Sequence, residues 1–418
     1  MGLPGWGVGR RIGFRFGILV GALLAFPFPI GTIPKTAWLA DLLNRPLEAV
    51  VSWFAQNVLG LADPSLVETG SGDRIWNYLE LLAILVLAAI GTTVWSVIDR
   101  RRTAYPRLAA GAQVALRYYV ASAMLGYGFA KILKLQFPTL TAGWFDRRVG
   151  EMSPMRLLWT FMGYSRPYTV FAGLAELLGG VLLLWRRTAA IGALIIVAIM
   201  TNVVMLNFCY DVPVKLYSAQ LLVMALLIAL PSVRRLIAAA MGRATPEVPP
   251  RARMAPRAER TRQLAKCATL GALACSLCVS FYDEVNRIPA SHELGGTWTV
   301  DSFVADSMER PPLSTDADRW QTISANPTLL WISPMTGPRV GLGLHVDAVN
   351  RTINVAIDDK GSDKKTTETW TYERPAPDQL VIDGMHAGKY LHVTLHLEPP
   401  PLLVTRGFHW INEVPFLR

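Results

Sequence analysis

Long apolar runs separated by short basic segments dominate the first 290 residues, and a period-two pattern replaces them after residue 295. A helix needs roughly 17–25 mostly apolar residues to cross a bilayer. We expect seven such helices, at residues 12–33, 75–98, 110–133, 168–185, 189–208, 216–231 and 264–282. The last run is the weakest, because it is short and rich in Ala, Gly, Ser and Cys. The first run lacks a small-residue cleavage site, so we expect it to remain as a span.

Basic residues fall on one side of this arrangement. They precede the first run, follow the second and the fourth, and form a dense cluster between the sixth and the seventh. Lys and Arg are enriched in cytoplasmic loops. We therefore expect a multi-pass membrane protein with a cytoplasmic N-terminus and an external C-terminal domain. If residues 264–282 do not cross the membrane, that domain is instead cytoplasmic.

Two connecting segments stand out. Residues 34–74 are expected to form an outer loop, and they contain an amphipathic stretch at residues 42–61. This stretch fits either a helix lying along the membrane interface or a helix packed within the loop, and the pattern leaves both open. Residues 244–256 hold four prolines and are expected to form an unordered linker.

Alternating apolar and polar residues after Gly295 predict short β-strands. We expect eight, at residues 297–304, 328–332, 340–346, 352–357, 366–372, 379–382, 390–397 and 402–405. This number of short strands favours a closed antiparallel barrel. The sequence Gly296-Thr-Trp298 resembles the opening motif of lipocalin-like barrels.

The expected fold class is therefore an α-helical polytopic membrane protein with a C-terminal all-β, lipocalin-like barrel. We divide the chain into two N-terminal helices with an external loop (1–109), a four-helix core (110–235), a basic cytoplasmic linker (236–263), a seventh helix (264–283) and an external β-domain (289–418).

Composition supports this division. The chain has 418 residues, of which 52% are hydrophobic and only 17% charged, as in a membrane protein. The net charge of +10 is uneven: residues 289–418 hold 11 Lys and Arg against 16 Asp and Glu, so the basic excess lies among the apolar runs. Basic residues in that position set the orientation of the spans in the membrane, so we expect no nucleic-acid partner.

Ionisable residues within the apolar runs are the candidate functional residues, because charge in a bilayer is costly unless it is paired or wetted. Tyr127, Lys131 and Lys134 are spaced to share one helix face. Glu176, near mid-depth, is expected to meet Tyr127 or a lysine. Counted from the outer ends of the runs, the candidate ligand-binding residues are Tyr127, Lys131, Glu176, Asn202, Asn207, Asp211 and Lys215. They predict either an outward-opening polar pocket for a quinone or a lipid head group, or an ion-paired network that sets helix register.

The cysteine and histidine residues give weaker indications of a functional site. The four cysteines include Cys275-Ser-Leu-Cys278, but this pair lies in an apolar helix, where packing is the expected role. Cys209, beside Asp211, is the better candidate for reactivity. His392 and His396 share a strand face without a third ligand, so no metal site is expected.

The polar motifs resemble the DoxX family of bacterial four-helix membrane proteins. The resemblance covers residues 110–235 and rests on Arg117-Tyr-Tyr119, Tyr127-Gly-Phe-Ala-Lys131, Ala175-Glu-Leu-Leu-Gly-Gly180 and the segment from Met200 to Lys215. Some DoxX relatives belong to a thiosulfate:quinone oxidoreductase, and others are linked to membrane redox defence.

The resemblance implies a redox-associated protein of the bacterial inner membrane, so the external domain is expected to be periplasmic. The polar cluster makes quinone the candidate cofactor, with membrane lipid or a redox protein as partner. The catalytic residues remain unidentified, and whether the chain is an enzyme stays open. The alternative is a non-enzymatic binding or scaffold protein whose β-domain takes an apolar ligand or an envelope partner.

Overall fold

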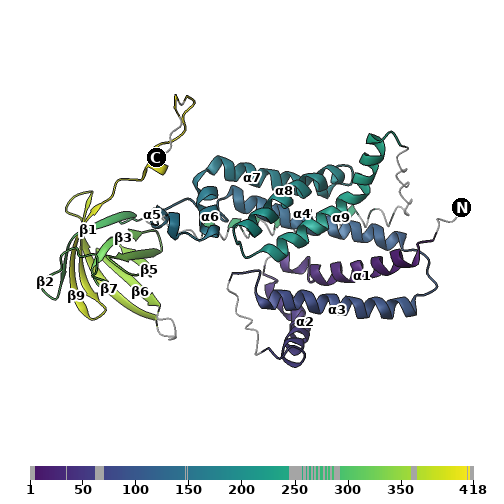
Figure 1. The fold of residues 1–418 in the computed structure, drawn as a ribbon, viewed down its shortest axis with the longest axis horizontal. Coiled ribbons are helices and arrows are strands. Elements are labelled where there is room, and N and C mark those ends of the chain that lie inside the picture. The colour runs from purple at the N-terminus through teal and green to yellow at the C-terminus, as the bar shows by residue number, and fades with distance from the viewer. Residues whose placement is uncertain are drawn as a thin grey trace. The chain divides into compact units, whose positions relative to one another are not determined.

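The computed structural model describes residues 5–33, 35–61, 70–145, 147, 149–243, 292–358, 365–411 and 413–414, with scattered positions between 257 and 286. The chain forms two compact units (Figure 1). One is helical and comprises Met1–Pro138 and Pro154–Val285, and the other is mainly β-structure and comprises Thr139–Ser153 and Asn286–Arg418. The predicted linker at residues 244–256 lies outside the described residues. So does much of the predicted seventh span, whose described positions are helical.

The helical unit matches the apolar pattern closely. Its main helices are α1 (Val8–Ala25), α2 (Ala37–Asn57), α3 (Ile75–Ile98), α4 (Pro106–Ile132), α6 (Pro154–Tyr164), α7 (Arg166–Leu184), α8 (Ala189–Cys209) and α9 (Lys215–Ala240). Within the described residues, four helices are long and apolar enough to cross a membrane: α3, α7, α8 and the Lys215–Val233 part of α9. The chain is therefore a membrane protein with a helical core. Helices α1 and α4 coincide with two further predicted spans but carry more Arg and Lys.

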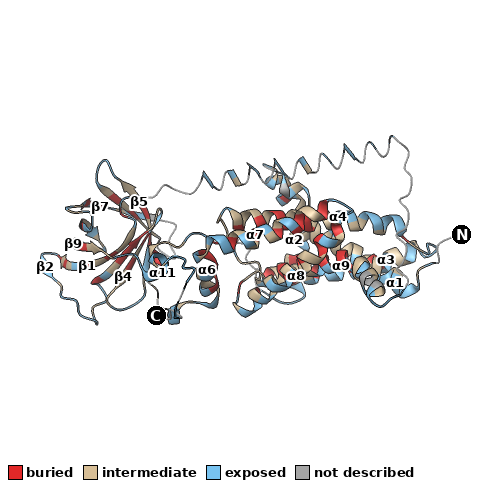
Figure 2. Ribbon diagram, turned by 90° about the horizontal axis from the view of Figure 1, so that it is seen from above, coloured by how far each residue is buried: buried red, intermediate tan, exposed pale blue. Residues whose placement is uncertain are grey.

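Glycine residues bring α4, α7 and α8 into close contact. A methyl group on Gly173 of α7 would lie 2.6 Å from the carbonyl oxygen of Gly128 on α4. A methyl group on Gly179 would lie 2.7 Å from a side-chain carbon of Ile196 on α8. Buried residues line the faces of these helices in Figure 2. Small residues on either side of Glu176 therefore allow close contact between these helices.

Arg15 differs from the role that its position suggests. The sequence places it among the basic residues that set topology, yet its side chain is buried. Its guanidinium donates hydrogen bonds to the hydroxyl of Tyr105, to Ser96 Oγ at 2.8 Å and to the Asp99 carbonyl at 2.9 Å. Arg15 therefore ties α1 to the end of α3 and the start of α4.

Helix α2 packs against α3, which is one of the two roles that its amphipathic pattern left open. Val51 and Ala55 pack against Trp76 and Leu79 of α3. On the other side, Trp53 is exposed, as are several other large apolar side chains of the helix. The helix is thus packed along one face and exposes large apolar side chains elsewhere, and its contact with the membrane interface stays a prediction.

The β-unit is a closed, all-antiparallel barrel of eight strands. The strands are β1 (Gly296–Ala305), β3 (Trp320–Ala325), β4 (Leu329–Pro334), β5 (Val340–Asp347), β6 (Thr352–Asp358), β7 (Lys365–Glu373), β8 (Gln379–His386) and β9 (Lys389–Leu397). Each pairs with the next, and β1 pairs with β9 to close the barrel. The short β2 (Met308–Glu309) extends β1 as a hairpin.

Two strand predictions are wrong. Residues 402–405 form a short helix, α11 (Leu402–Thr405), because β1 already pairs with β9 and the closed barrel offers no free edge. Strand β3 was missed because a register shift between Trp320 and Thr322 interrupts its period-two alternation, and its remaining core positions hold only Ile323 and the small Ala325.

Side chains fill the barrel. Trp298, Phe303, Trp320 and Trp370 belong to one continuous buried cluster. The ring centroids of Trp320 and Trp370 lie 5.6 Å apart, and the Trp298 indole donates a hydrogen bond of 3.0 Å to the Leu294 carbonyl. A barrel of this size can be a packed core or hold one small ligand, and this core is packed.

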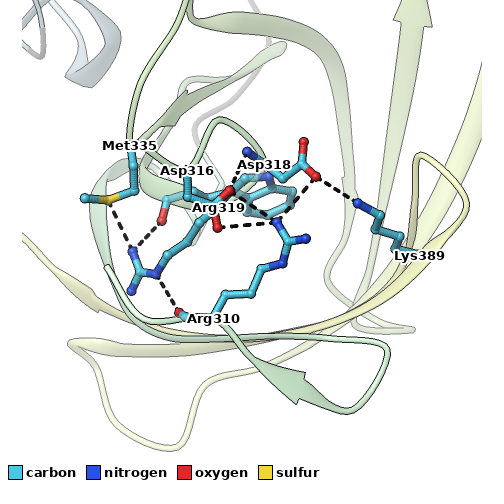
Figure 3. Close-up of polar contacts among 7 residues, drawn as sticks. Arg310, Asp316, Asp318, Arg319, Met335 and Lys389 are labelled. Atoms are coloured by element: carbon cyan, nitrogen blue, oxygen red, sulfur yellow. Dashed lines mark hydrogen bonds and ion pairs between the residues drawn. The ribbon is translucent and has the colours of Figure 1, made fainter. Parts of the chain in front are cut away.

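The connection from β2 to β3 is held by a polar network at one end of the barrel (Figure 3). Arg310 lies 3.2 Å from Asp316 and 3.3 Å from Asp318, and Lys389 of β9 lies 2.8 Å from Asp318. Buried Arg319 donates to the carbonyl oxygens of Arg310 and Trp320. The network fixes the connection against β9, so these charged residues have a structural role.

Candidate functional site

A buried ion pair links α4 to α7 in the helical unit. The ammonium nitrogen of Lys131 lies 2.8 and 2.7 Å from the two carboxylate oxygens of Glu176, and both side chains are more than nine-tenths buried. Because Gly128 and Gly173 have no side chains, the backbones of α4 and α7 lie close enough for Lys131 to contact Glu176. Of the partners predicted for Glu176, Lys131 is the one observed.

Aromatic rings surround the ammonium group. Lys131 Nζ lies 5.5 Å from the ring centroid of Tyr127 and 6.0 Å from that of Phe137. Such rings attract a cation through their π-faces and exclude water from it. The pair is therefore neutral as a unit and held in an apolar shell.

Lys134 does not join this face. Helix α4 ends at Ile132, and Lys134 has a positive φ of 61°. Its ammonium donates a hydrogen bond of 2.9 Å to the Gly163 carbonyl. The predicted helical spacing fails because the helix ends before its third member.

A second polar group forms where α8 connects to α9. Lys215 Nζ lies 2.7 Å from the Asp211 carboxylate and 3.7 Å from that of Asp73. The Asp73 carboxylate also accepts hydrogen bonds from the backbone nitrogens of Lys215 and Leu216, at 2.8 and 3.0 Å. Asp73 therefore caps α9. Sequence reasoning missed it because more than 140 residues of chain separate the two partners.

The two asparagines lie in different environments. Asn202 is exposed on α8, and Asn207, which is five residues further along, is buried. The side-chain nitrogen of Asn207 has no hydrogen-bond partner within the described part of the chain. The seven predicted residues thus separate into three groups. These are the buried cluster of Tyr127, Lys131 and Glu176, the pair of Asp211 and Lys215 between α8 and α9, and two asparagines that the structure does not bring together.

An open-sided cavity of about 300 Å³ lies near the buried cluster, with Tyr217 between its lining and Tyr127. It is formed by the end of α1, the segment that follows α1, the middle of α4 and the first turn of α9. Its lining includes Leu24, Phe28, Tyr119, Ser122, Ala123 and Tyr217. Apart from Ser122 and the two phenol hydroxyls, these side chains are apolar.

Three tyrosines connect the cavity to the ion pair. The hydroxyl groups of Tyr119 and Tyr217 lie within interaction range of one another. The Tyr217 ring centroid is 6.4 Å from that of Tyr127, which itself faces Lys131. Sequence reasoning did not select Tyr119 or Tyr217. The spacing of Tyr119, Ala123 and Tyr127 along one face of α4 was the available signal.

Other candidates have structural explanations or remain isolated. Arg117 donates hydrogen bonds of 2.9 and 2.5 Å to the Leu183 carbonyl near the end of α7. On the barrel, His392 pairs with Asp383 and His396 with Asp301, each at 2.7 Å. No group of three metal-ligating side chains occurs among the residues that the structure describes. Cys209 is exposed at the end of α8.

Comparisons with known proteins give one informative match. No family model matches the chain, and no solved structure matches it. The uncharacterized protein YwoB of Bacillus subtilis is 38% identical over 112 residues, which are 27% of this chain and 71% of YwoB. Because the match covers most of YwoB, this chain belongs to the same protein family as YwoB through that 112-residue segment.

Proposed function

We propose that this chain is a DoxX-like, redox-associated inner-membrane protein that binds a quinone-like ligand in the cavity beside Tyr119 and Tyr217. The observation that carries the proposal is the position of this apolar cavity next to a buried ion pair, with three tyrosines between them.

The chemistry of the cavity favours a flat, apolar ring that bears carbonyl oxygens. Leu24, Phe28 and Ala123 supply an apolar lining, and the hydroxyls of Tyr119 and Tyr217 supply hydrogen-bond donors. Ligand sites in proteins commonly combine an apolar wall with a few placed polar groups. The volume of about 300 Å³ suits a single ring system with its nearest substituents.

Lys131 and Glu176 serve the ligand indirectly in this proposal. They contact each other rather than the cavity, so they act as a neutral proton-exchanging pair behind Tyr127. Electrons come from a partner redox protein. The outer end of the same bundle contains Asn207, Asp211 and Lys215. Asn202 is exposed, so it would contact a ligand only from outside the bundle.

The topology is part of the proposal. We infer seven spans, with α1, α4 and residues 264–282 crossing in addition to the four most apolar helices. The N-terminus is then cytoplasmic, and the barrel is periplasmic. The alternative function, an apolar ligand held inside the barrel, is less favoured because buried side chains occupy the interior.

The test is mass spectrometry of the organic extract from protein purified in its native lipids. Ala123→Leu fills the cavity, and Tyr217→Phe removes one hydroxyl. Tyr118→Phe is the matched control, because Tyr118 neighbours Tyr119 but does not line the cavity. We expect a quinone with the wild type and the control, and a loss of quinone with Ala123→Leu.

Glu176→Gln separates binding from proton exchange. We expect this variant to retain the quinone but to slow its reduction by a membrane donor. Equal amounts of bulk phospholipid and no quinone in the wild type and every variant would refute the proposal.

A further inference from the structure

The segment that follows the barrel exposes an unusual amount of apolar surface. Residues 402–414, called here the post-barrel segment, leave Trp410 91% exposed and Phe408 75% exposed. Its other exposed large apolar residues are Leu402, Leu403, Val404, Ile411 and Val414. Exposed large apolar side chains gathered in one short segment indicate a contact with a protein or a membrane.

The barrel does not cover this segment. The pairing of β1 with β9 leaves no free edge at that position, and the interior already holds the packed cluster around Trp298 and Trp370. Three consecutive prolines at residues 399–401 follow β9, and the segment leaves the barrel wall there, as the yellow ribbon in Figure 1 shows.

We propose that the post-barrel segment inserts its apolar side chains into the lipid–water interface of the bilayer that holds the helical unit. Its apolar residues do not form one stripe. Leu402, Leu403 and Val404 are consecutive, and so are Trp410 and Ile411, so they point in several directions. A protein groove has a fixed shape that fits one ridge of side chains, whereas the fluid lipid interface adapts to apolar side chains that are irregularly arranged.

The composition of the segment fits the same environment. Phe408 and Trp410 form an edge-to-face pair with ring centroids 5.1 Å apart. Trp is enriched at the interface because its indole is apolar but carries one N–H donor. Of Asp, Glu, Lys and Arg, the segment contains only Arg406 and Glu413. The membrane-spanning helices of the same chain keep a bilayer within reach, which raises its effective concentration.

The experiment measures the depth of a nitroxide label on the full chain in nanodiscs of phosphatidylcholine and phosphatidylglycerol. The four native cysteines are replaced by serine, and the label is attached through Ile411→Cys. Val349→Cys is the control, because Val349 is 92% exposed on the turn after β5. Collisions with oxygen report lipid, and collisions with a water-soluble nickel complex report solvent.

We expect the label at residue 411 to collide more with oxygen and less with nickel than the label at residue 349. Adding Phe408→Ser and Trp410→Ser should return residue 411 to the values of the control. Nickel accessibility equal to that of the control without these two changes would overturn the proposal. Shielding from both reagents would also overturn it, because a protein surface would then cover the segment.

Discussion

The ammonium group of Lys131 contacts both carboxylate oxygens of Glu176, so a single buried contact neutralises the charge of each residue. Removing one member of such a pair leaves an uncompensated charge away from water, whereas removing both members can be nearly neutral.

We therefore expect Lys131→Met to lower the free energy of unfolding by about 3–5 kcal/mol. The double variant Lys131→Met with Glu176→Leu should recover most of this loss. Thermal unfolding of the purified protein in detergent measures both. A double variant that is no more stable than the single variant would show that the ion pair is not the source of the effect.

The contact of Gly173 with Gly128 makes a second prediction. A methyl group on Gly173 meets a backbone oxygen, which cannot move aside as a flexible side chain can. Gly173→Ala should lower stability by about 1–3 kcal/mol through overpacking. The control is Gly126→Ala on α4, which meets no atom within 4 Å and should raise stability by up to about 1 kcal/mol because Ala favours the helix. Opposite signs for the two variants in thermal unfolding confirm this prediction.

Asp73 supplies a third prediction, because its carboxylate holds the first backbone N–H groups of α9. Asp73→Ala should cost about 0.5–2 kcal/mol, as the loss of a helix cap does. It should also speed hydrogen exchange at the amides of Lys215 and Leu216. Asp211→Asn is the control, since Asp211 is exposed and its carboxylate bonds the Lys215 side chain rather than the first backbone N–H groups of α9. Unchanged exchange at Leu216 in Asp73→Ala would contradict the capping role.

The barrel network predicts a pH effect. The hydrogen bond from Lys389 lowers the pKa of the Asp318 carboxyl below its usual value. A lowered pKa stabilises the folded state above the pKa of the unfolded chain, and this contribution disappears as the pH falls through the folded pKa. Lys389→Met should therefore raise the pKa of Asp318 in a carboxyl-carbon NMR titration.

Lys389→Met should reduce stability at neutral pH, and the difference from the wild type should vanish in acid. Arg310 also lowers the pKa of Asp318, so we expect part of the shift to persist in this variant. A difference in stability that is independent of pH would assign the effect to packing rather than to charge.

The two fold classes could be predicted from the sequence because each follows from a pattern that is local in the chain. Apolar runs of spanning length predicted α3, α7, α8 and α9, and period-two alternation predicted seven of the eight barrel strands. The prediction failed at residues 402–405, because those residues have strand-like composition but no strand edge to pair with.

The candidate site was predicted only in part. Lys131, Glu176, Asp211 and Lys215 were selected because ionisable residues within or at the edge of apolar runs are costly unless they are paired or in contact with water. Asp73, Tyr119 and Tyr217 were not selected. Their roles depend on contacts between distant parts of the chain, which periodicity does not record.

The sequence by itself determined which segments are apolar enough for a membrane, which alternate as strands, and which carry charge that needs a partner. The tertiary structure decided which groups interact. Glu176 pairs with Lys131, buried Arg15 bonds Tyr105, and Asp73 caps the start of α9. It also decided that a cavity forms beside three tyrosines, and that the barrel is filled. The physical reason is that hydrophobic patterning acts along one segment, whereas ion pairs, caps and cavities depend on how separate segments pack.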